Sequence, residues 1–322
     1  MQKQLSAITY IRCIATIMIV LFHCLCYNGS IWKGIYPDYH YMWLYCIGGN
    51  FLRSLALPIF FITSGYLYGY LFLYKGKYKD NSFLINKIKR LFIPCVFWGG
   101  ISIWLFPNIC YLKDLLWGEG HLWFLNVLLI FFLVIHLIKT FLQKTPLYID
   151  VVIILALCGL YDSHLFPSIT FEKHMIYAPS FICGFYIAKY INFEKTSSIK
   201  RYTLVSLIIA SMVIHELLCV LNFIPHMFDV LIVSIIFILT YRFFHSMKTT
   251  IPKIVAFFDR DSMGIYIIHH IIIWYSLNFQ VIKDFLNCNY ICPIVYFTIV
   301  ISLSWASAHL LNKYPFTKWT LG

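Results

Sequence analysis

An arginine and a histidine lie inside the first long apolar stretch of the chain, residues 7–26. His23 follows Arg12 by eleven residues, about three helical turns, so both side chains project from one helix face about 16 Å apart along the axis. An ionisable side chain at membrane depth is costly unless it is paired or faces water, and it usually serves a function. A neutral imidazole can accept a proton and a guanidinium can bind phosphate, so the pair predicts a functional site.

Two further clusters follow. In the segment LPIFFITSGYLYGY, Pro58 interrupts the helical hydrogen bonding, and Ser64 with the glycine after it forms a small surface that another helix or a ligand can approach. In NKIKRLFIPCVFW, Lys87 and Arg90 stand three residues apart where the next apolar segment begins. A packing kink and ordinary anchoring of basic residues at the inner membrane face are the structural alternatives for these clusters.

Histidines mark the last two clusters. The segment GHLWFL places His121 beside Trp123 at the outer end of a predicted span, where such residues are usually structural. In DSMGIYIIHH, Tyr266 and His269 are three residues apart and share a helix face. His269 lies about two turns into an apolar span and needs a polar partner there, so it is the stronger candidate for function.

The composition predicts the elements that must position these residues. With 61% hydrophobic and only 12% charged residues, the chain of 322 residues differs from soluble proteins, which have about 25% charged residues. We expect an all-α polytopic transmembrane bundle that forms one membrane-embedded domain over residues 1–322. About ten helices are predicted, over residues 7–26, 55–73, 91–105, 122–138, 147–160, 175–190, 202–221, 228–244, 263–279 and 291–311.

Charge predicts the orientation. If the N-terminus is cytoplasmic, the inner segments contain nineteen Lys and Arg residues and the outer segments five, with Arg12 left out because it lies inside the first span. This bias is the one that the positive-inside rule requires. Both termini are then cytoplasmic. The net charge of +12 follows from this topology, and no compact basic stripe indicates a nucleic-acid partner. No cysteine or histidine spacing is typical of a metal site.

Taken together, these segments resemble the acyltransferase 3 family of integral membrane O-acyltransferases. The resemblance rests on Arg12 and His23, on PIFFITSGYL, KIKRLFIP and HLWFL, and on SMGIYIIH, all in the family's order. It implies transfer of an acyl group, usually acetyl from acetyl-CoA, to a hydroxyl of an envelope carbohydrate or a lipid-linked glycan, in a bacterial cytoplasmic membrane. The chain ends at Gly322 and so resembles members without a fused hydrolase-like domain.

Within that resemblance the residues take specific roles. His23 is the candidate base or acyl-carrying residue, and Arg12, Lys87 and Arg90 are candidates for binding the phosphates of CoA. Lys87 stands where family members commonly have arginine, which weakens its assignment because lysine lacks bidentate geometry. The supporting or acceptor-side candidates are Ser64, His121, Trp123, Tyr266 and His269, and the acceptor is expected to approach near His121 and residues 27–54.

Other interpretations remain open at this point. Arg12, His23 and Glu216 also suit a transporter or flippase of a polar or lipid-linked solute, although no two-halved repeat is present. A membrane sensor is a third possibility without specific support. His215 and Glu216 match no family motif and are either a buried pair that supports the site or packing with a satisfied hydrogen bond. The acceptor and the acyl group are not predicted by any residue pattern.

Overall fold

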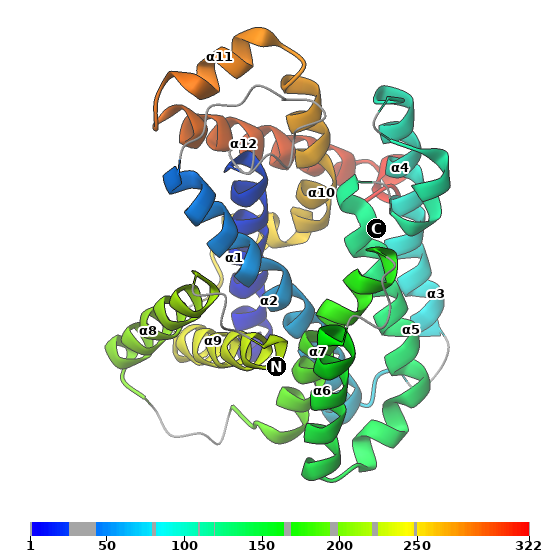
Figure 1. The fold of residues 1–322 in the computed structure, drawn as a ribbon. Helices are drawn as coiled ribbons and strands as arrows, with labels where there is room; N and C mark the ends of the chain where they lie inside the picture. Colours follow the sequence, from blue (N-terminus) through cyan, green and yellow to red (C-terminus); the bar gives the residue numbers. More distant parts are fainter. Residues whose placement is uncertain are drawn as a thin grey trace. The chain divides into compact units, whose positions relative to one another are not determined.

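The computed structural model describes residues 2–25, 43–78, 82–108, 110–118, 120–163, 169–193, 199–220, 225–247 and 250–321. These ranges are helical and contain no strand. The longer helices are α1 (Gln2–Leu25), α2 (Trp43–Lys75), α4 (Ile93–Leu105), α5 (Trp123–Lys144), α6 (Leu147–Asp162), α7 (Ile169–Tyr190), α8 (Arg201–Val220), α9 (His226–Ser246), α10 (Lys253–Ser276) and α12 (Cys292–Lys313) (Figure 1). Short elements are α3 (Ser82–Lys87), the π-turn Ile88–Phe92, the 3-10 turns Leu112–Trp117 and Gly120–Leu122, α11 (Gln280–Cys288) and α13 (Pro315–Lys318).

The helical membrane class is confirmed, but the count of ten spans is not. Each predicted range falls on a helix, yet within the described residues only seven spans are long and apolar enough to cross a membrane. An eighth is reached if α10 and α11, which are bent by 100° to each other, form one span. The other two predicted spans, α6 and α7, do not meet these criteria. The helix α6 has only 16 residues, and α7 carries charged side chains towards both ends, which shortens its apolar part.

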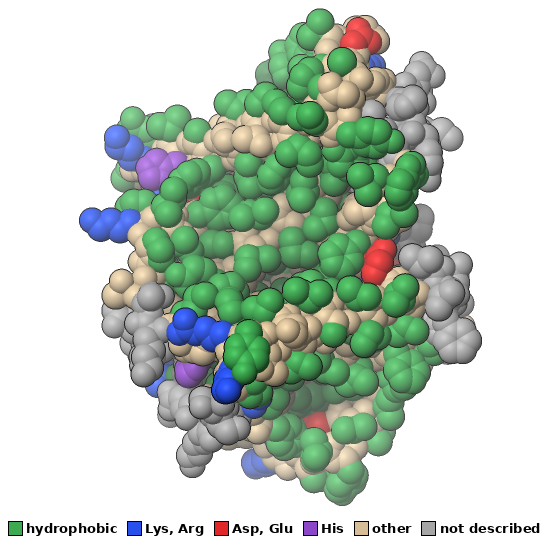
Figure 2. All heavy atoms as spheres, turned by 90° about the vertical axis from the view of Figure 1, so that its left-hand side faces the viewer, with side chains coloured by type: hydrophobic (Ala, Val, Ile, Leu, Met, Phe, Trp, Pro, Cys, Tyr) green, Lys and Arg blue, Asp and Glu red, His purple; other side chains and the backbone are tan. Residues whose placement is uncertain are grey.

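The molecular surface agrees with this class. Figure 2 shows a face on which hydrophobic side chains cover most of the area and charged side chains are few and scattered. Large apolar residues such as Leu137, Ile209 and Leu303 are more than half exposed. In water this surface would be unfavourable, so its natural surroundings are the acyl chains of membrane lipids.

The chain divides into two compact units. Unit 1 contains Met1–Arg12, Pro58–Asn86 and Val127–Pro252, and unit 2 contains Cys13–Leu57, Lys87–Asn126 and Lys253–Gly322. Pro58, inside α2, is the first residue of that helix that belongs to unit 1. The boundary also falls within α1, so Arg12 belongs to unit 1 and His23 to unit 2 on one continuous helix.

Unit 2 is built around α10 and α12, which pack against each other (Figure 1). A Cβ atom on Gly264 would lie 2.7 Å from the Cβ of Ala308, so the two small residues allow close approach of the helices. Near the cytoplasmic end predicted for α10, the fully buried carboxylate of Asp261 contacts Arg260, His309 Nδ1 at 3.0 Å and Asn312 Nδ2 at 2.9 Å. These hydrogen bonds satisfy a buried charge and connect α10 to α12.

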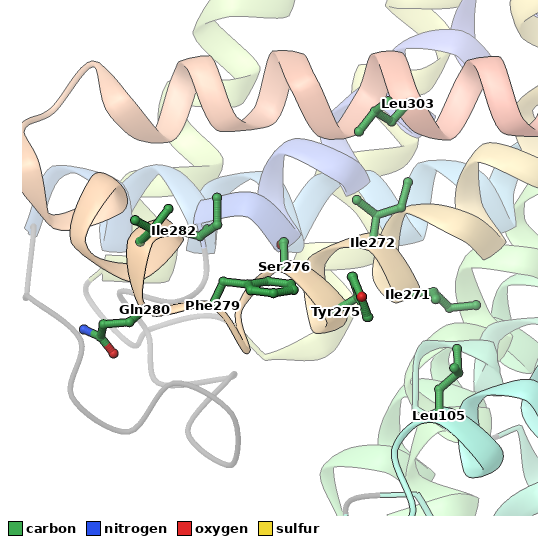
Figure 3. A pocket seen from close by; sticks show the side chains of 10 residues that line it. Leu105, Ile271, Ile272, Tyr275, Ser276, Phe279, Gln280, Ile282 and Leu303 are labelled. Carbon is green, nitrogen blue, oxygen red and sulfur yellow. The ribbon is translucent and has the colours of Figure 1, made fainter.

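An apolar hollow of about 850 Å³ lies at the other end of α10, beside α11 and α12 (Figure 3). Its wall includes Ile271 and Ile272, which directly follow the histidine pair of α10, and Leu303 of α12. The only polar side chains of its wall are those of Tyr275, Ser276 and Gln280. A wall of this kind suits hydrocarbon and contains no charged group.

In unit 1, α2 and α7 approach through glycines. A Cβ atom on Gly65 would overlap the carbonyl oxygen of Phe181, and one on Gly184 would overlap that of Ile62. The small surface that the sequence predicts around Ser64 and Gly65 therefore receives another helix at Gly65. The Nε2 atom of His215 in α8 lies 2.7 Å from Oδ1 of Asp229 in α9. This contact agrees with the alternative in which His215 is a packed residue with a satisfied hydrogen bond.

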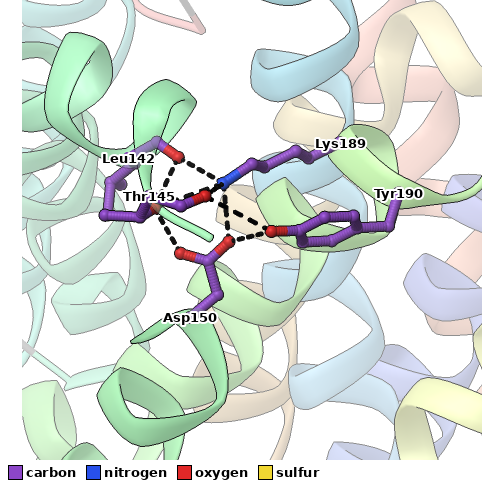
Figure 4. A network of polar contacts seen from close by, with 5 residues as sticks. All are labelled: Leu142, Thr145, Asp150, Lys189 and Tyr190. Atoms are coloured by element: carbon purple, nitrogen blue, oxygen red, sulfur yellow. Dashed lines mark hydrogen bonds and ion pairs between the residues drawn. The ribbon is translucent and has the colours of Figure 1, made fainter. Parts of the chain in front are cut away.

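A polar network joins the ends of three helices of unit 1 (Figure 4). The Lys189 ammonium, at the end of α7, donates to the carbonyl oxygens of Leu142 and Thr145 at 2.7 and 2.6 Å and contacts Asp150 Oδ2 at 2.6 Å. Tyr190 donates to the same carboxylate oxygen at 2.6 Å, and the Thr145 hydroxyl donates to Asp150 Oδ1. The ammonium thus binds carbonyls at the C-terminal end of α5, and the carboxylate of Asp150 lies in the first turn of α6. The helix dipole favours a positive charge at the first position and a negative charge at the second.

This network predicts a stability defect. The side chains of Lys189 and Asp150 are 11% and 2% exposed, so the change D150N leaves a largely buried ammonium without its counter-ion. We expect the apparent Tm of the purified protein in detergent to fall by about 5 °C or more. The change D162N, at an exposed position of the same helix, is the control. Equal unfolding temperatures of D150N and D162N would show that the ion pair of Lys189 with Asp150 does not stabilise the fold.

Candidate active site

The candidate active site in unit 2 is centred on His23. The helix α1 is continuous from Gln2 to Leu25 and covers the predicted span up to residue 25, because this segment contains neither Pro nor Gly. His23 is in its last turn and half-buried. Its Nδ1 atom lies 3.0 Å from the carbonyl oxygen of Ile19, one turn earlier, and 3.1 Å from Nε2 of His269 in α10.

Three other imidazole rings pack around His23. The ring centroid of His23 lies 5.0 Å from that of His269 and 5.3 Å from that of His270. His121 stacks on His270 with 4.1 Å between centroids and an interplanar angle of 18°, and its ring lies 5.5 Å from His269. The structure therefore brings together four of the predicted residues, His23, His121, Tyr266 and His269, and adds His270.

The hydrogen bonds determine which nitrogen of each neutral ring carries the proton. A carbonyl oxygen only accepts, so Nδ1 of His23 carries hydrogen and donates to Ile19. His269 likewise donates from Nδ1 to the carbonyl oxygen of Ile265 at 3.0 Å. The Nε2 atom of a neutral His269 then holds a lone pair and accepts from His23 Nδ1, which leaves the basic lone pair of His23 on Nε2.

His121 has a similarly defined tautomer. Its Nε2 atom is 3.0 Å from the carbonyl oxygen of Ile267, to which it donates. Its Nδ1 atom is therefore an acceptor, and it is buried and has no hydrogen-bond partner among the described residues. A buried acceptor without a partner costs free energy unless water or a bound hydroxyl donates to it.

Two glycines hold the short loop before α5 against α10. Gly118 and Gly120 have φ angles of +91° and +54°, which favour glycine. A Cβ atom on Gly120 would lie 2.9 Å from the ring of Trp274, and one on Gly118 would overlap the backbone of Trp123. The carbonyl of His121 accepts a hydrogen bond from the hydroxyl of Tyr266, which joins this loop to α10 together with the hydrogen bond from His121 Nε2 to Ile267.

The remaining predicted residues occupy other elements. Lys87 ends α3 and Arg90 lies in the π-turn Ile88–Phe92, after which Pro94 lies at the start of α4; π-turns of this kind are frequent at functional sites. Ser64 is in the part of α2 that belongs to unit 1. Trp123 is the first residue of α5 and half-buried. Of the predicted acceptor loop at residues 27–54, residues 27–42 lie outside the described residues.

Sequence reasoning missed three features of this site. His270 was visible only as the second histidine of the pair in α10, and the glycines of the GEGHLW segment were visible only as turn residues. Arg53 of α2 was counted only as an outer positive charge, but it lies in unit 2 with His23 and its charge acts weakly on that ring. Within the described residues, no group of three or more His, Cys, Asp or Glu side chains is arranged to hold a metal ion.

The chain matches a known protein family over most of its length. The family model described as an acyltransferase domain matches residues 5–312, nearly the whole chain and every segment of the predicted motif series. The chain belongs to the acyltransferase 3 family. Searches of curated proteins and of solved structures give no match. The match favours a membrane acyltransferase over the transporter alternative.

The loop glycines of this acyltransferase lead to a prediction. The change G118A places a Cβ atom against the backbone of Trp123 at a φ of +91°, so it should displace His121 and lower the apparent Tm and acyltransferase activity. The control is G100A, in α4, where an added Cβ atom meets nothing within 4 Å. Equal activity and equal Tm in the two variants would show that the loop conformation does not matter.

Proposed function

We propose that this protein transfers an acyl group, most simply acetyl, from cytoplasmic acyl-CoA to a hydroxyl group of an envelope carbohydrate in a bacterial cytoplasmic membrane. The family match supports acyl transfer by a membrane protein. The observation that carries the proposed mechanism is the hydrogen bonding of His23, which leaves a basic Nε2 atom on a ring whose other nitrogen is fixed by Ile19 and His269.

The reaction then needs few groups. The acceptor hydroxyl gives its proton to His23 Nε2 while its oxygen attacks the thioester carbonyl, and the tetrahedral intermediate collapses by breaking the carbon–sulfur bond. The departing CoA thiolate takes the proton back from His23. Arg53, an exposed cation of the same unit whose charge acts weakly on His23, is a candidate to stabilise the oxyanion.

The surrounding histidines take supporting roles in this proposal. His269 is a positioning residue, because its Nε2 lone pair holds the Nδ1–H of His23 and so keeps the base in one tautomer and orientation. His121 Nδ1 is a candidate to accept a hydrogen bond from a second hydroxyl of a sugar, which would satisfy its buried lone pair. A carbohydrate acceptor offers several such hydroxyls.

Binding of the donor is assigned to cationic residues. We retain Arg12, Lys87 and Arg90 as candidates for the phosphates of CoA, with acetyl-CoA as the donor and no metal ion. Arg12 precedes His23 by about 16 Å along α1. That distance is similar to the length of a pantetheine arm, so the phosphates would remain on the inner side while the thioester reaches His23.

The two roles on α1 are separable by experiment. The change H23A should reduce CoA release from acetyl-CoA in the presence of a glycan panel by at least about a thousandfold while leaving the Kd for CoA unchanged. The change R12A should raise that Kd by about tenfold or more, since it removes a charge-assisted contact to phosphate. An R12A protein with unchanged affinity for CoA would contradict the assignment of Arg12.

The positioning role of His269 predicts a graded result. In H269Q the amide oxygen can replace the acceptor at Nε2, so kcat should fall by less than about tenfold, whereas H269L should lose about a hundredfold or more with a KM that changes little. The apparent Tm of each variant separates this effect from unfolding. If H269Q and H269L are equally impaired at equal stability, the hydrogen bond to His23 is not what His269 contributes.

A further inference from the structure

A second pocket, in unit 1, is not used by the site described above. It has a volume of about 210 Å³ and lies between the last turns of α2 and the segment that follows α7. The charge pattern of the sequence predicts that these helix ends face the cytoplasm. Its wall includes four aromatic side chains, a lysine and an amide: Tyr66, Tyr70, Tyr74, Phe193, Lys75 and Asn192.

The aromatic wall follows from the sequence of α2. Tyr66, Tyr70 and Tyr74 are spaced by four residues and therefore share one helix face. The rings of Tyr66 and Tyr70 are stacked with centroids 6.2 Å apart, and Tyr66 and Tyr70 are buried whereas Tyr74 is half exposed. The opposite wall is Phe193, whose ring stacks on that of Tyr241 in α9 at 4.1 Å. The pocket thus has a buried aromatic floor and a polar mouth.

Positive charge is concentrated at this mouth. The ammonium of Lys75 lies 5.6 Å from the ring centroid of Tyr70, and Lys77 follows two residues later on the exposed chain. No acidic residue contributes to the wall. An aromatic slot with an adjacent cation and several hydroxyl and amide groups suits a flat heterocycle that carries phosphate, because the ring stacks and the phosphate meets the ammonium.

We propose that this pocket binds the adenosine 3′,5′-bisphosphate end of the acyl-CoA donor, with the base among the tyrosines and a phosphate at Lys75. This proposal rests on the proposed function, which requires a nucleotide-bearing donor at the cytoplasmic face. The pocket's volume fits a purine base and excludes the whole cofactor, so the pantetheine arm would extend out of it. The apolar hollow beside α10 has no cation and cannot hold phosphate in this way.

The inner end of α1 belongs to the same unit as this pocket. The ring of Tyr10 stacks on Phe244 of α9 at 4.7 Å, and Tyr241, three residues earlier in α9, packs on Tyr66 at 5.2 Å. The last turns of α9 thus contact both the pocket wall and the helix that carries Arg12. Lys75 and Arg12 thus belong to one unit, and both are candidates to bind phosphates of the same donor.

The test measures binding of CoA and, separately, of adenosine 3′,5′-bisphosphate to the full-length protein in nanodiscs by calorimetry. The variants are K75E and Y74L, both at exposed positions, so folding should be retained and is checked by the apparent Tm. The matched controls are K253E, an exposed lysine at the start of α10, and Y148L, an exposed tyrosine near the start of α6.

We expect K75E and Y74L to raise the Kd of both ligands by about tenfold while the controls change neither by more than about twofold. If the wild type binds CoA and transfers acyl groups but K75E and Y74L bind as the controls do, the pocket assignment is wrong and the proposed function stands. If the wild type binds neither ligand and releases no CoA, both proposals fail together.

Discussion

The arrangement of this acyltransferase depends on one N–H group, the Nδ1–H of His23. Two acceptors lie within hydrogen-bond distance of it, the carbonyl oxygen of Ile19 at 3.0 Å and Nε2 of His269 at 3.1 Å. Because a neutral imidazole has one hydrogen and one lone pair, this contact decides that Nε2 is the basic atom. Both partners belong to the protein itself, so the geometry of α1 and α10 directly controls the chemistry of the ring.

The rest of unit 2 can be understood as support for that contact. Tyr266 and the glycines at 118 and 120 hold His121 against α10, and Gly264 permits the close packing of α10 on α12. One buried carboxylate in each unit accepts several hydrogen bonds and connects two helices: Asp261 joins α10 to α12, and Asp150 joins α6 to α7. These two buried carboxylates therefore fix how neighbouring helices pack within each unit.

Much of the fold and part of the site could be predicted from the sequence. Long apolar segments and the lysine distribution indicate a helical membrane protein, and a histidine inside an apolar span, such as His269, needs a partner. The partner itself could not be predicted, because His23 and His269 are 246 residues apart and helical periodicity is local. The pair of Lys189 with Asp150 could not be predicted for the same reason, because the two residues lie far apart in the sequence. The count of ten spans is not confirmed, since α6 has only 16 residues and α7 carries charged side chains towards both ends.

The most direct test of this account is the tautomer of His23 in the resting protein. Nitrogen NMR of ¹⁵N-histidine-labelled protein in lipid, with the His23 signals assigned by their absence in H23Q, distinguishes a protonated from a lone-pair nitrogen. The account predicts hydrogen on Nδ1 and a lone pair on Nε2, with H269L, but not H269Q, shifting the ring towards a mixture of tautomers. A wild-type His23 with hydrogen on Nε2 would contradict it, because the lone pair would then lie on Nδ1, which faces Ile19 and His269, and Nε2 could not accept the proton of the acceptor hydroxyl.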